Sequence, residues 1–411
     1  MKEIFETIDR CRICGTSDLV EILNLGEQPP ANSLYEKSGS KPQNVPLRLM
    51  FCEKCSTVQL GEDVDPEYLF GEYLWVTGTS GTALKYSEKF TKKALKYTNN
   101  KKPFIVEVAS NDGTFLKQFQ NSGCKVLGVD PAKNISEIAS KNGIPTHVDF
   151  FTRDLAKKLL SKHQSADIVY ARNVIPHVKE IHSVIDGIKT FMDDDGVGII
   201  EFHNAGLLLE QLHYDYIYHE HLFYYTLTSI EYLLNKHSLY IFDTMASPIS
   251  GGSWVVYFTK EQRDKTEALK EAQRHDVVQQ DSQYKKWLEF SVNAKKHADK
   301  LSDIVKKEVS NSGRIIAYGA SARSSTLLNY CGLTSDHISV VIDKNPLKHD
   351  LLTAGSNIPI VSYLDGVRLV KEVDVILLLA WNFKDEIIDE LVISGYQGKF
   401  IIPLPGAPKI I

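Results

Sequence analysis

The sequence predicts an α/β protein in which two Rossmann-like doubly wound domains are joined by a helical connection and preceded by a small zinc-binding module. Three observations support this prediction. The 411 residues, 43% of them apolar, exceed what one ordinary domain needs. Two stretches, 104–202 and 313–403, each alternate buried strands with helical patterns. Four of the six cysteines form two C-x-x-C pairs near the N-terminus.

Composition and periodicity divide the chain into four segments. Residues 1–70 carry the cysteine pairs and show little helical periodicity, as a small metal-organised module would. Residues 71–263 and 313–411 hold the two α/β patterns. Between them, 264–312 is rich in Lys, Glu, Gln and Ala, with apolar residues at helical spacing. We expect this last segment to be a long helical connection whose charges form a solvated face.

The cysteines form the strongest metal signal. Cys11 and Cys14 are separated by two residues, as are Cys52 and Cys55, so each tight turn can aim two sulfurs at one ion. Four thiolates suit tetrahedral structural zinc and leave no open position for catalysis. The alternative is two unrelated redox or chance pairs, although thioredoxin-like chemistry needs only one pair. The long interval 15–51 requires the chain to leave this site and return.

A tight turn after the first buried strand is the candidate cofactor site. Residues 104–109 form the predicted strand, 110–113 the turn and 114–120 the start of a helix. This is where α/β sheets bind nucleotides. The turn departs from G-x-G-x-x-G, and its acids Glu107 and Asp112 would repel a pyrophosphate but suit a cationic ligand.

The next predicted strand, 126–130, ends in an acid. Asp130 is placed to accept hydrogen bonds from the two hydroxyls of a ribose. A cationic amino acid joined to an adenosine fits both features, so we predict S-adenosylmethionine rather than NAD. The residues expected to bind it are Glu107, Ser110, Asn111, Asp112, Gly113, Asp130, Pro131 and Asn173.

Residues 213–225 concentrate histidines, tyrosines and acids just after the last strand of the first α/β pattern. Because ligands bind at this edge, we favour acid/base catalysis by a histidine that a glutamate and a tyrosine orient. A metal site of His219, Glu220 and His221 is one alternative, although consecutive ligands diverge on a strand or helix. A structural network is another. His177, expected at the same edge, is a second candidate base.

Together these motifs resemble the S-adenosylmethionine-dependent C-methyltransferases that act on nucleotide-linked deoxysugars, of the dTDP-4-keto-deoxysugar C3-methyltransferase type. The resemblance covers nearly the whole chain. It includes the two cysteine pairs, the E-x-x-S-N-D-G turn at 107–113, Asn-Val-x-x-His at 173–177, Tyr-His-Glu-His at 218–221, and a C-terminal Rossmann-like domain. All of them occur in the family's order.

The resemblance implies a reaction and the roles of four residues. A histidine matching His221 would remove the C3 proton of a 4-keto sugar, and the resulting enolate would attack the methyl group. The family's tyrosine and glutamate match Tyr218 and Glu220, and a further active-site histidine matches His177. Tyr218 or His177 could donate a hydrogen bond to the oxygen at C4.

Two positions depart from the family pattern and allow an altered preference for sugar or nucleotide. Trp75 stands where many members carry a tyrosine, and the turn 319–323 lacks the Pro and Lys that relatives often have. The turn still suits a diphosphate, because it precedes a helix and carries an arginine. The alternative is a scaffold with a decayed cofactor site. The residues expected to bind substrate are Ser321, Arg323 and Ser324.

Charge and hydropathy narrow the functional classes. The 47 basic and 52 acidic residues give a net charge of -5, so we expect neither nucleic acid nor membrane as a partner. The first residues lack the apolar stretch of a signal peptide, and we expect a cytoplasmic monomer or weak homo-oligomer. Three competing functions remain: an O- or N-methyltransferase of a nucleotide sugar, an NAD-dependent oxidoreductase, and a nucleic-acid-binding or assembly protein built on the zinc module.

Overall fold

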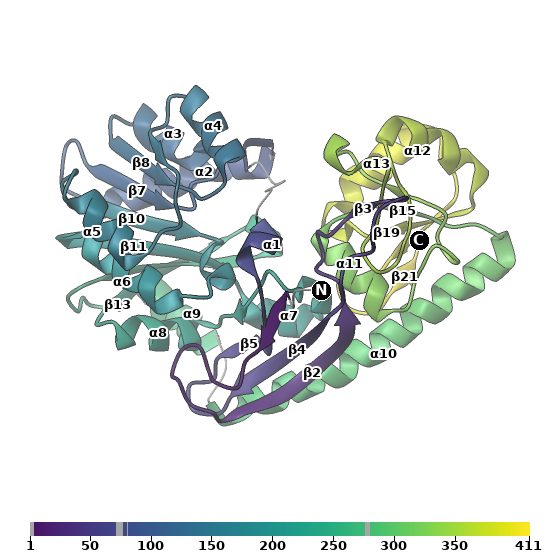
Figure 1. Cartoon of the computed structure of the whole chain (residues 1–411), viewed down its shortest axis with the longest axis horizontal. Coiled ribbons are helices and arrows are strands. Elements are labelled where there is room, and N and C mark those ends of the chain that lie inside the picture. The colour runs from purple at the N-terminus through teal and green to yellow at the C-terminus, as the bar shows by residue number, and fades with distance from the viewer. Residues whose placement is uncertain (1–3, 71–76, 80, 276–279) are drawn as a thin grey trace.

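The computed structural model describes residues 4–70, 77–79, 81–275 and 280–411 (Figure 1). Trp75 therefore lies outside the described residues. Three sheets dominate the described chain: an antiparallel N-terminal sheet, a seven-stranded central sheet and a six-stranded C-terminal sheet. A 33-residue helix, α10 (Gln280–Ser312), runs beside the N-terminal sheet towards the C-terminal one.

The central sheet has the strand order β13-β14-β11-β10-β7-β8-β9. Its strands are β7 (Phe104–Val108), β8 (Lys125–Val129), β9 (Thr146–His147), β10 (Ala166–Arg172), β11 (Met192–His203), β13 (Tyr240–Ser247) and β14 (Ser253–Thr259). The strands from β7 to β11 are parallel, as their apolar runs predict. The hairpin β13–β14 adds two antiparallel strands at one edge, which the expectation of a doubly wound parallel sheet lacked.

Helices cover both faces of the central sheet. On one face, α2 (Gly81–Ala94), α3 (Thr114–Asn121) and α4 (Lys133–Lys141) share a core with Ile105. On the other face, α5 (Arg153–Leu160), α6 (Ile181–Phe191) and α8 (Leu227–Lys236) share a core with Val106. Successive strand residues point to opposite faces, and the alternation of Ile105 and Val106 therefore places apolar side chains under both helix layers.

The N-terminal sheet incorporates a strand from the middle of the chain. Its order is β12-β5-β4-β2, formed by β2 (Leu19–Gln28), β4 (Val45–Cys52), β5 (Val58–Leu60) and β12 (Phe223–Tyr224). A separate pair joins β1 (Phe5–Thr7) to β6 (Glu62–Val64), and α1 (Pro66–Phe70) follows. Because β12 pairs with β5, residues 213–225 are attached directly to this sheet.

The long interval between the cysteine pairs forms an arm that reaches the C-terminal sheet region. Within it, β3 (Tyr35–Glu36) pairs antiparallel with β17 (Leu351–Leu352). The Tyr35 hydroxyl donates a hydrogen bond to Asn357 Oδ1. The chain thus leaves the metal site, contacts a segment far along the sequence and returns through β4.

The C-terminal sheet has the order β18-β16-β15-β19-β20-β21. Its strands are β15 (Ile316–Tyr318), β16 (Val341–Ile342), β18 (Ile360–Val361), β19 (Val375–Leu378), β20 (Lys399–Ile402) and β21 (Lys409–Ile410). All neighbours are parallel except β21, which is antiparallel to β20. Its helices are α11 (Ala322–Tyr330), α12 (Tyr363–Leu369) and α13 (Lys384–Ile393), and α9 (Glu267–His275) precedes α10.

Candidate active site

The four cysteine sulfurs converge as a tetrahedral zinc site requires. All lie within 4.8 Å of one another, with Sγ–Sγ distances of 3.6 Å for Cys11–Cys55 and 3.5 Å for Cys14–Cys52. Four sulfurs at the usual zinc–sulfur bond length would be about 3.8 Å apart. Each pair sits in a tight turn that closes with a 2.8 Å backbone bond, from Gly15 N in one turn and Ser56 N in the other. The thiols therefore fit zinc.

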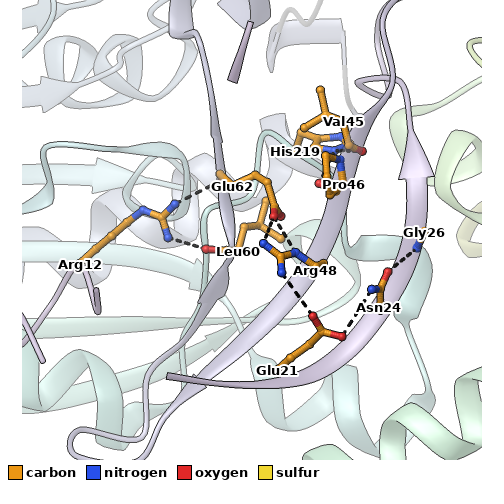
Figure 2. Close-up of polar contacts among 10 residues, drawn as sticks. All are labelled: Arg12, Glu21, Asn24, Gly26, Val45, Pro46, Arg48, Leu60, Glu62 and His219. Carbon is orange, nitrogen blue, oxygen red and sulfur yellow. Dashed lines mark hydrogen bonds and ion pairs between the residues drawn. The ribbon is translucent and has the colours of Figure 1, made fainter. Parts of the chain in front are cut away.

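Polar contacts fasten the first cysteine turn to the neighbouring strands (Figure 2). The Arg12 guanidinium donates to Leu60 O at 2.6 Å and to Glu62 O at 3.2 Å. On the other side of the strand, Arg48 Nε donates to the Glu62 carboxylate at 2.7 Å. These contacts join the metal site to β5, the strand that pairs with β12.

The cofactor turn lies between β7 and α3. Three of its residues, Ala109, Asn111 and Gly113, have positive φ angles of 55°, 50° and 77°. A Cβ atom at position 113 would lie 2.8 Å from Ile144 Cγ1. The close approach of the Ile144 side chain therefore also requires glycine at this position. Because every second residue has a positive φ angle, the backbone turns sharply and forms a compact loop at the carboxyl edge of the sheet.

Asp130 holds this loop from the adjacent strand end. Its buried carboxylate accepts Asn111 N at 2.8 Å and Ala132 N at 2.9 Å, and Pro131 lies between. Burial raises the pKa of Asp130 above its ordinary value, and the two backbone hydrogen bonds offset only part of this rise. Each carboxylate oxygen keeps a further lone pair, which is what a ribose hydroxyl would need.

Two further groups at the turn fit a polar, positively charged ligand. Glu107 is buried, accepts a 2.9 Å bond from the Tyr170 hydroxyl, and has its pKa raised by burial to about 8. A ligand cation would stabilise its charged form. Ser110 Oγ is buried, and within the described ranges no group lies at hydrogen-bonding distance from it. A buried hydroxyl without a partner is suited to bind a polar group of a ligand.

Asn111 and Asp112 also hold residues 77–79 over the turn. Asn111 Oδ1 accepts Thr77 N and Asp112 Oδ2 accepts Gly78 N, both at 2.9 Å. Asp112 therefore acts within the protein as well as near the predicted ligand. Asn173, on the next strand end, has a φ of 51° and donates its backbone N–H to Glu201 O.

His221 is fixed between two tyrosines in the segment 213–225. Its Nδ1 lies 3.0 Å from Tyr216 O, and its Nε2 lies 2.9 Å from the Tyr218 hydroxyl. A carbonyl can only accept, so Nδ1 carries the proton and Nε2 keeps a lone pair that accepts from Tyr218. The His177 ring packs edge-on against His221, with centroids 4.7 Å apart. The structure thus brings together the histidines predicted at the carboxyl edge.

Burial keeps these histidines neutral. The pKa of His221 is well below its ordinary value because of burial and of the neighbouring His177. Burial also lowers the pKa of His177 to about 4. At neutral pH His221 Nε2 therefore carries a lone pair, which in this structure accepts the Tyr218 hydroxyl.

The other two members of the histidine motif face the N-terminal module. His219 Nε2 lies 3.2 Å from Val45 O, and Asn32 donates to the Glu220 carboxylate. Burial raises the pKa of Glu220 to about 7. Among the described residues the cysteines form the one group that could hold a metal ion, which counts against the alternative site at His219, Glu220 and His221.

Arg323 contacts the segment 213–225 from the C-terminal side. Its guanidinium donates to both oxygens of buried Asp215, each at 3.0 Å, and lies 4.6 Å from the centroid of Trp381. Ser321 and Ser324 form a capping box at the start of α11, so their hydroxyls serve the helix. The three predicted substrate residues thus lie at this junction, with two of them engaged in local structure.

Sequence reasoning missed four residues that shape the site: Asn32, Asp215, Tyr216 and Trp381. Asp215 and Tyr216 belong to the segment already singled out, and their titratable and aromatic character was the available signal. Asn32 and Trp381 lie far from it along the chain, and no local pattern marks them.

Three family models match successive parts of the chain. Residues 11–70 match the model of a zinc binding domain, 83–244 that of a methyltransferase domain, and 248–405 that of a C-methyltransferase C-terminal domain. C-methyltransferase NovU of Streptomyces niveus is 30% identical over 419 residues, covering 100% of this chain and 99% of the relative. The chain belongs to the C-methyltransferase family.

Membership of the C-methyltransferase family makes the protein an S-adenosylmethionine-dependent methyltransferase with structural zinc, confirming both predicted cofactors. Solved structures resemble parts of it. They include a magnesium protoporphyrin IX methyltransferase from Synechocystis with bound S-adenosylmethionine (12% identity, TM-score 0.34, 43% of this chain and 79% of that one). Another is a Burkholderia thailandensis 1,6-didemethyltoxoflavin N1-methyltransferase (13%, 0.34, 45% and 81%). Over the residues described, no helix has the length and apolarity to cross a bilayer.

We predict about one zinc ion per chain, since the four thiols complete a tetrahedral ion without other ligands. Cys52→Ser should lose zinc and unfold at a lower temperature, as elemental analysis and thermal denaturation would measure. Cys124→Ser, a change at a buried cysteine outside the cluster, is the matched control and should keep its zinc. Freshly purified, reduced protein without zinc would contradict the assignment.

Glu220→Gln should stabilise the protein at pH 8 and leave it unchanged near pH 4.5. A folded-state pKa of about 7 exceeds the ordinary 4.5, so burying this carboxyl costs free energy that is absent at low pH and grows as pH rises to about 7. The full difference is roughly 3 kcal/mol. Urea denaturation at both pH values measures it, with exposed Glu210→Gln as the control. A gain independent of pH would contradict this account.

Proposed function

We propose that this C-methyltransferase transfers a methyl group to C3 of a nucleotide-linked 4-keto-deoxysugar, with His221 as the base. In this proposal residues 71–263 form the domain that binds the methyl donor, and 313–411 form a second Rossmann-like domain that binds the nucleotide. The helices within 264–312 connect them. The observation that carries the proposal is the fixed His221 ring, whose Nδ1 is bound to Tyr216 O and which packs against the ring of His177.

The donor site would use the groups at the ends of β7 and β8. Asp130 would accept the ribose hydroxyls, while Glu107 and the Ser110 hydroxyl would face the methionine end. Bound S-adenosylmethionine supplies an electrophilic methyl group on a sulfonium. The protein's contribution is alignment of that methyl with the sugar carbon, since methyl transfer to a carbanion needs positioning more than acid help.

Proton removal would end at Nε2 of His221. In the described structure this nitrogen accepts the Tyr218 hydroxyl, so Tyr218 must turn away for the base to reach the sugar. In that position its hydroxyl can donate to the oxygen at C4, where negative charge develops. His177, beside His221, is the second group close enough to help. Glu220 would orient the sugar or the histidine motif without taking the proton.

Arg323 would bind the diphosphate with the part of its guanidinium that Asp215 does not use. Asp215 occupies Nε and one N–H of Nη2, and within the described part of the chain no group accepts a hydrogen bond from Nη1, which can therefore donate to an anion. Arginine suits such sharing because its five donors point in two directions. The rival function, methylation of a sugar oxygen or nitrogen, would not need the adjacent ketone, and carbon NMR of the product distinguishes the two.

Asp130→Ala should weaken S-adenosylmethionine binding by roughly 2–4 kcal/mol, because two charge-assisted hydrogen bonds would be lost. Isothermal titration calorimetry measures the affinity. Exposed Asp154→Ala, on the first turn of α5, is the control and should bind normally. Unchanged affinity in Asp130→Ala, or tight binding of NADH to the native enzyme, would count against the donor site.

His221→Ala should slow both methylation and C3 hydrogen exchange by at least about 100-fold while cofactor affinity stays nearly intact. Exchange of the sugar's C3 hydrogen for deuterium is followed by NMR in heavy water, with S-adenosylhomocysteine replacing the donor. Tyr218→Phe should be milder, since it removes a donor to the enolate but leaves the base. Equal losses in the two variants would make Tyr218 the proton relay, and full activity in His221→Ala would shift the base to His177.

A further inference from the structure

We infer that Asp215 is a positioning residue for His221, through which the C-terminal part of the chain sets the histidine's tautomer. The effect on proton removal rests on the proposed function, whereas the effect of Asp215 on the His221 tautomer does not. It concerns η4 (Tyr214–Tyr216), the short helical turn that precedes the histidine motif.

Asp215 is a buried carboxylate, 1% exposed, and its hydrogen-bond donors among the described residues come from the C-terminal sheet region. Arg323, in the first turn of α11, supplies two hydrogen bonds of 3.0 Å. Trp381, which follows β19, donates its Nε1–H at 2.9 Å. β15 and β19 are parallel neighbours, so both donors extend from the carboxyl ends of adjacent strands onto one side chain.

The next residue carries this contact to His221. The Tyr216 ring lies 5.4 Å from the Arg323 guanidinium carbon and stacks on His203 with centroids 3.9 Å apart. The Tyr216 carbonyl accepts the Nδ1–H of His221. A second bond from α11, Thr326 Oγ1 to Ile217 O at 2.7 Å, fixes the peptide that follows. The backbone that selects the tautomer is therefore clamped on both sides by α11.

Only a carboxylate satisfies this arrangement. Three donors converge on two oxygens, and the fork of Arg323 needs two acceptors in one plane. An amide at position 215 would present an N–H₂ group to the guanidinium and leave buried donors unpaired, which costs more than the bond itself. The clamp on Tyr216 would loosen, and His221 Nδ1 would lose its fixed acceptor.

An ordinary contact between domains would have a different effect. It would change stability while His221 kept one tautomer and its full rate per folded molecule. The tautomer is the discriminating quantity because ring ¹⁵N shifts separate Nδ1–H from Nε2–H imidazole, and this measurement needs neither sugar nor methyl donor.

The test compares native, zinc-loaded, full-length enzyme with Asp215→Asn, using ¹⁵N-histidine NMR and His221→Ala to assign the resonance. We expect the native His221 to be Nδ1–H and the variant to become a mixture of tautomers. Deuterium exchange at C3 should slow at least about 10-fold with S-adenosylmethionine affinity unchanged. Arg323→Lys keeps the positive charge but loses the two-pronged geometry of the guanidinium. Its tautomer mixture and its exchange rate should lie between those of the native enzyme and Asp215→Asn.

Tyr35→Phe is the matched control, because it removes a hydrogen bond to the C-terminal part at Asn357 and leaves η4 untouched. It should keep the native tautomer and exchange rate. A variant at Asp215 that is less stable but keeps the Nδ1–H tautomer would overturn the inference. An altered tautomer in an enzyme that methylates no keto sugar would instead leave the inference standing and refute the proposed function.

Discussion

A buried charged or catalytic group is costly without a hydrogen-bond partner, and this constraint governs how Asp215, Glu220 and His221 are held. Asp215 is satisfied by Arg323 and Trp381, Glu220 by Asn32, and His221 by its neighbouring tyrosines. No single sheet supplies all of these groups. The segment can therefore take its observed conformation only where the three largest sheets of the described chain meet.

The zinc module supports the candidate site through this arrangement. Its strand β5 pairs with β12, and Leu60 N donates to Leu222 O directly after the histidine motif. The four cysteine sulfurs would fill the tetrahedral positions of a zinc ion and leave none open for a substrate. What it fixes is the position of the sheet to which one end of the site is attached.

The sequence was informative wherever a signal is local. Parallel strands appear as apolar runs, and two thiols spaced by two residues need only one turn, so β7 and the Cys11 turn were predictable. The hairpin β13–β14 was missed because antiparallel edge strands carry a weaker pattern. Trp381 and Asn32 were missed because their roles arise from contacts between distant segments. Arg323 as a substrate residue stays a prediction, and its ion pair with Asp215 depends on how two sheets face each other, which no local spacing encodes.

The arm between the cysteine pairs has a consequence for biosynthesis. Tyr35 and Asn357, which its tip brings together, are 322 residues apart along the chain. At ordinary ribosomal speeds the partner strand emerges on the order of tens of seconds after the arm. During that time the short strand at Tyr35–Glu36 has an open edge, and the first cysteine turns can bind zinc long before the arm is anchored. The metal site can therefore form before the architecture around it is complete.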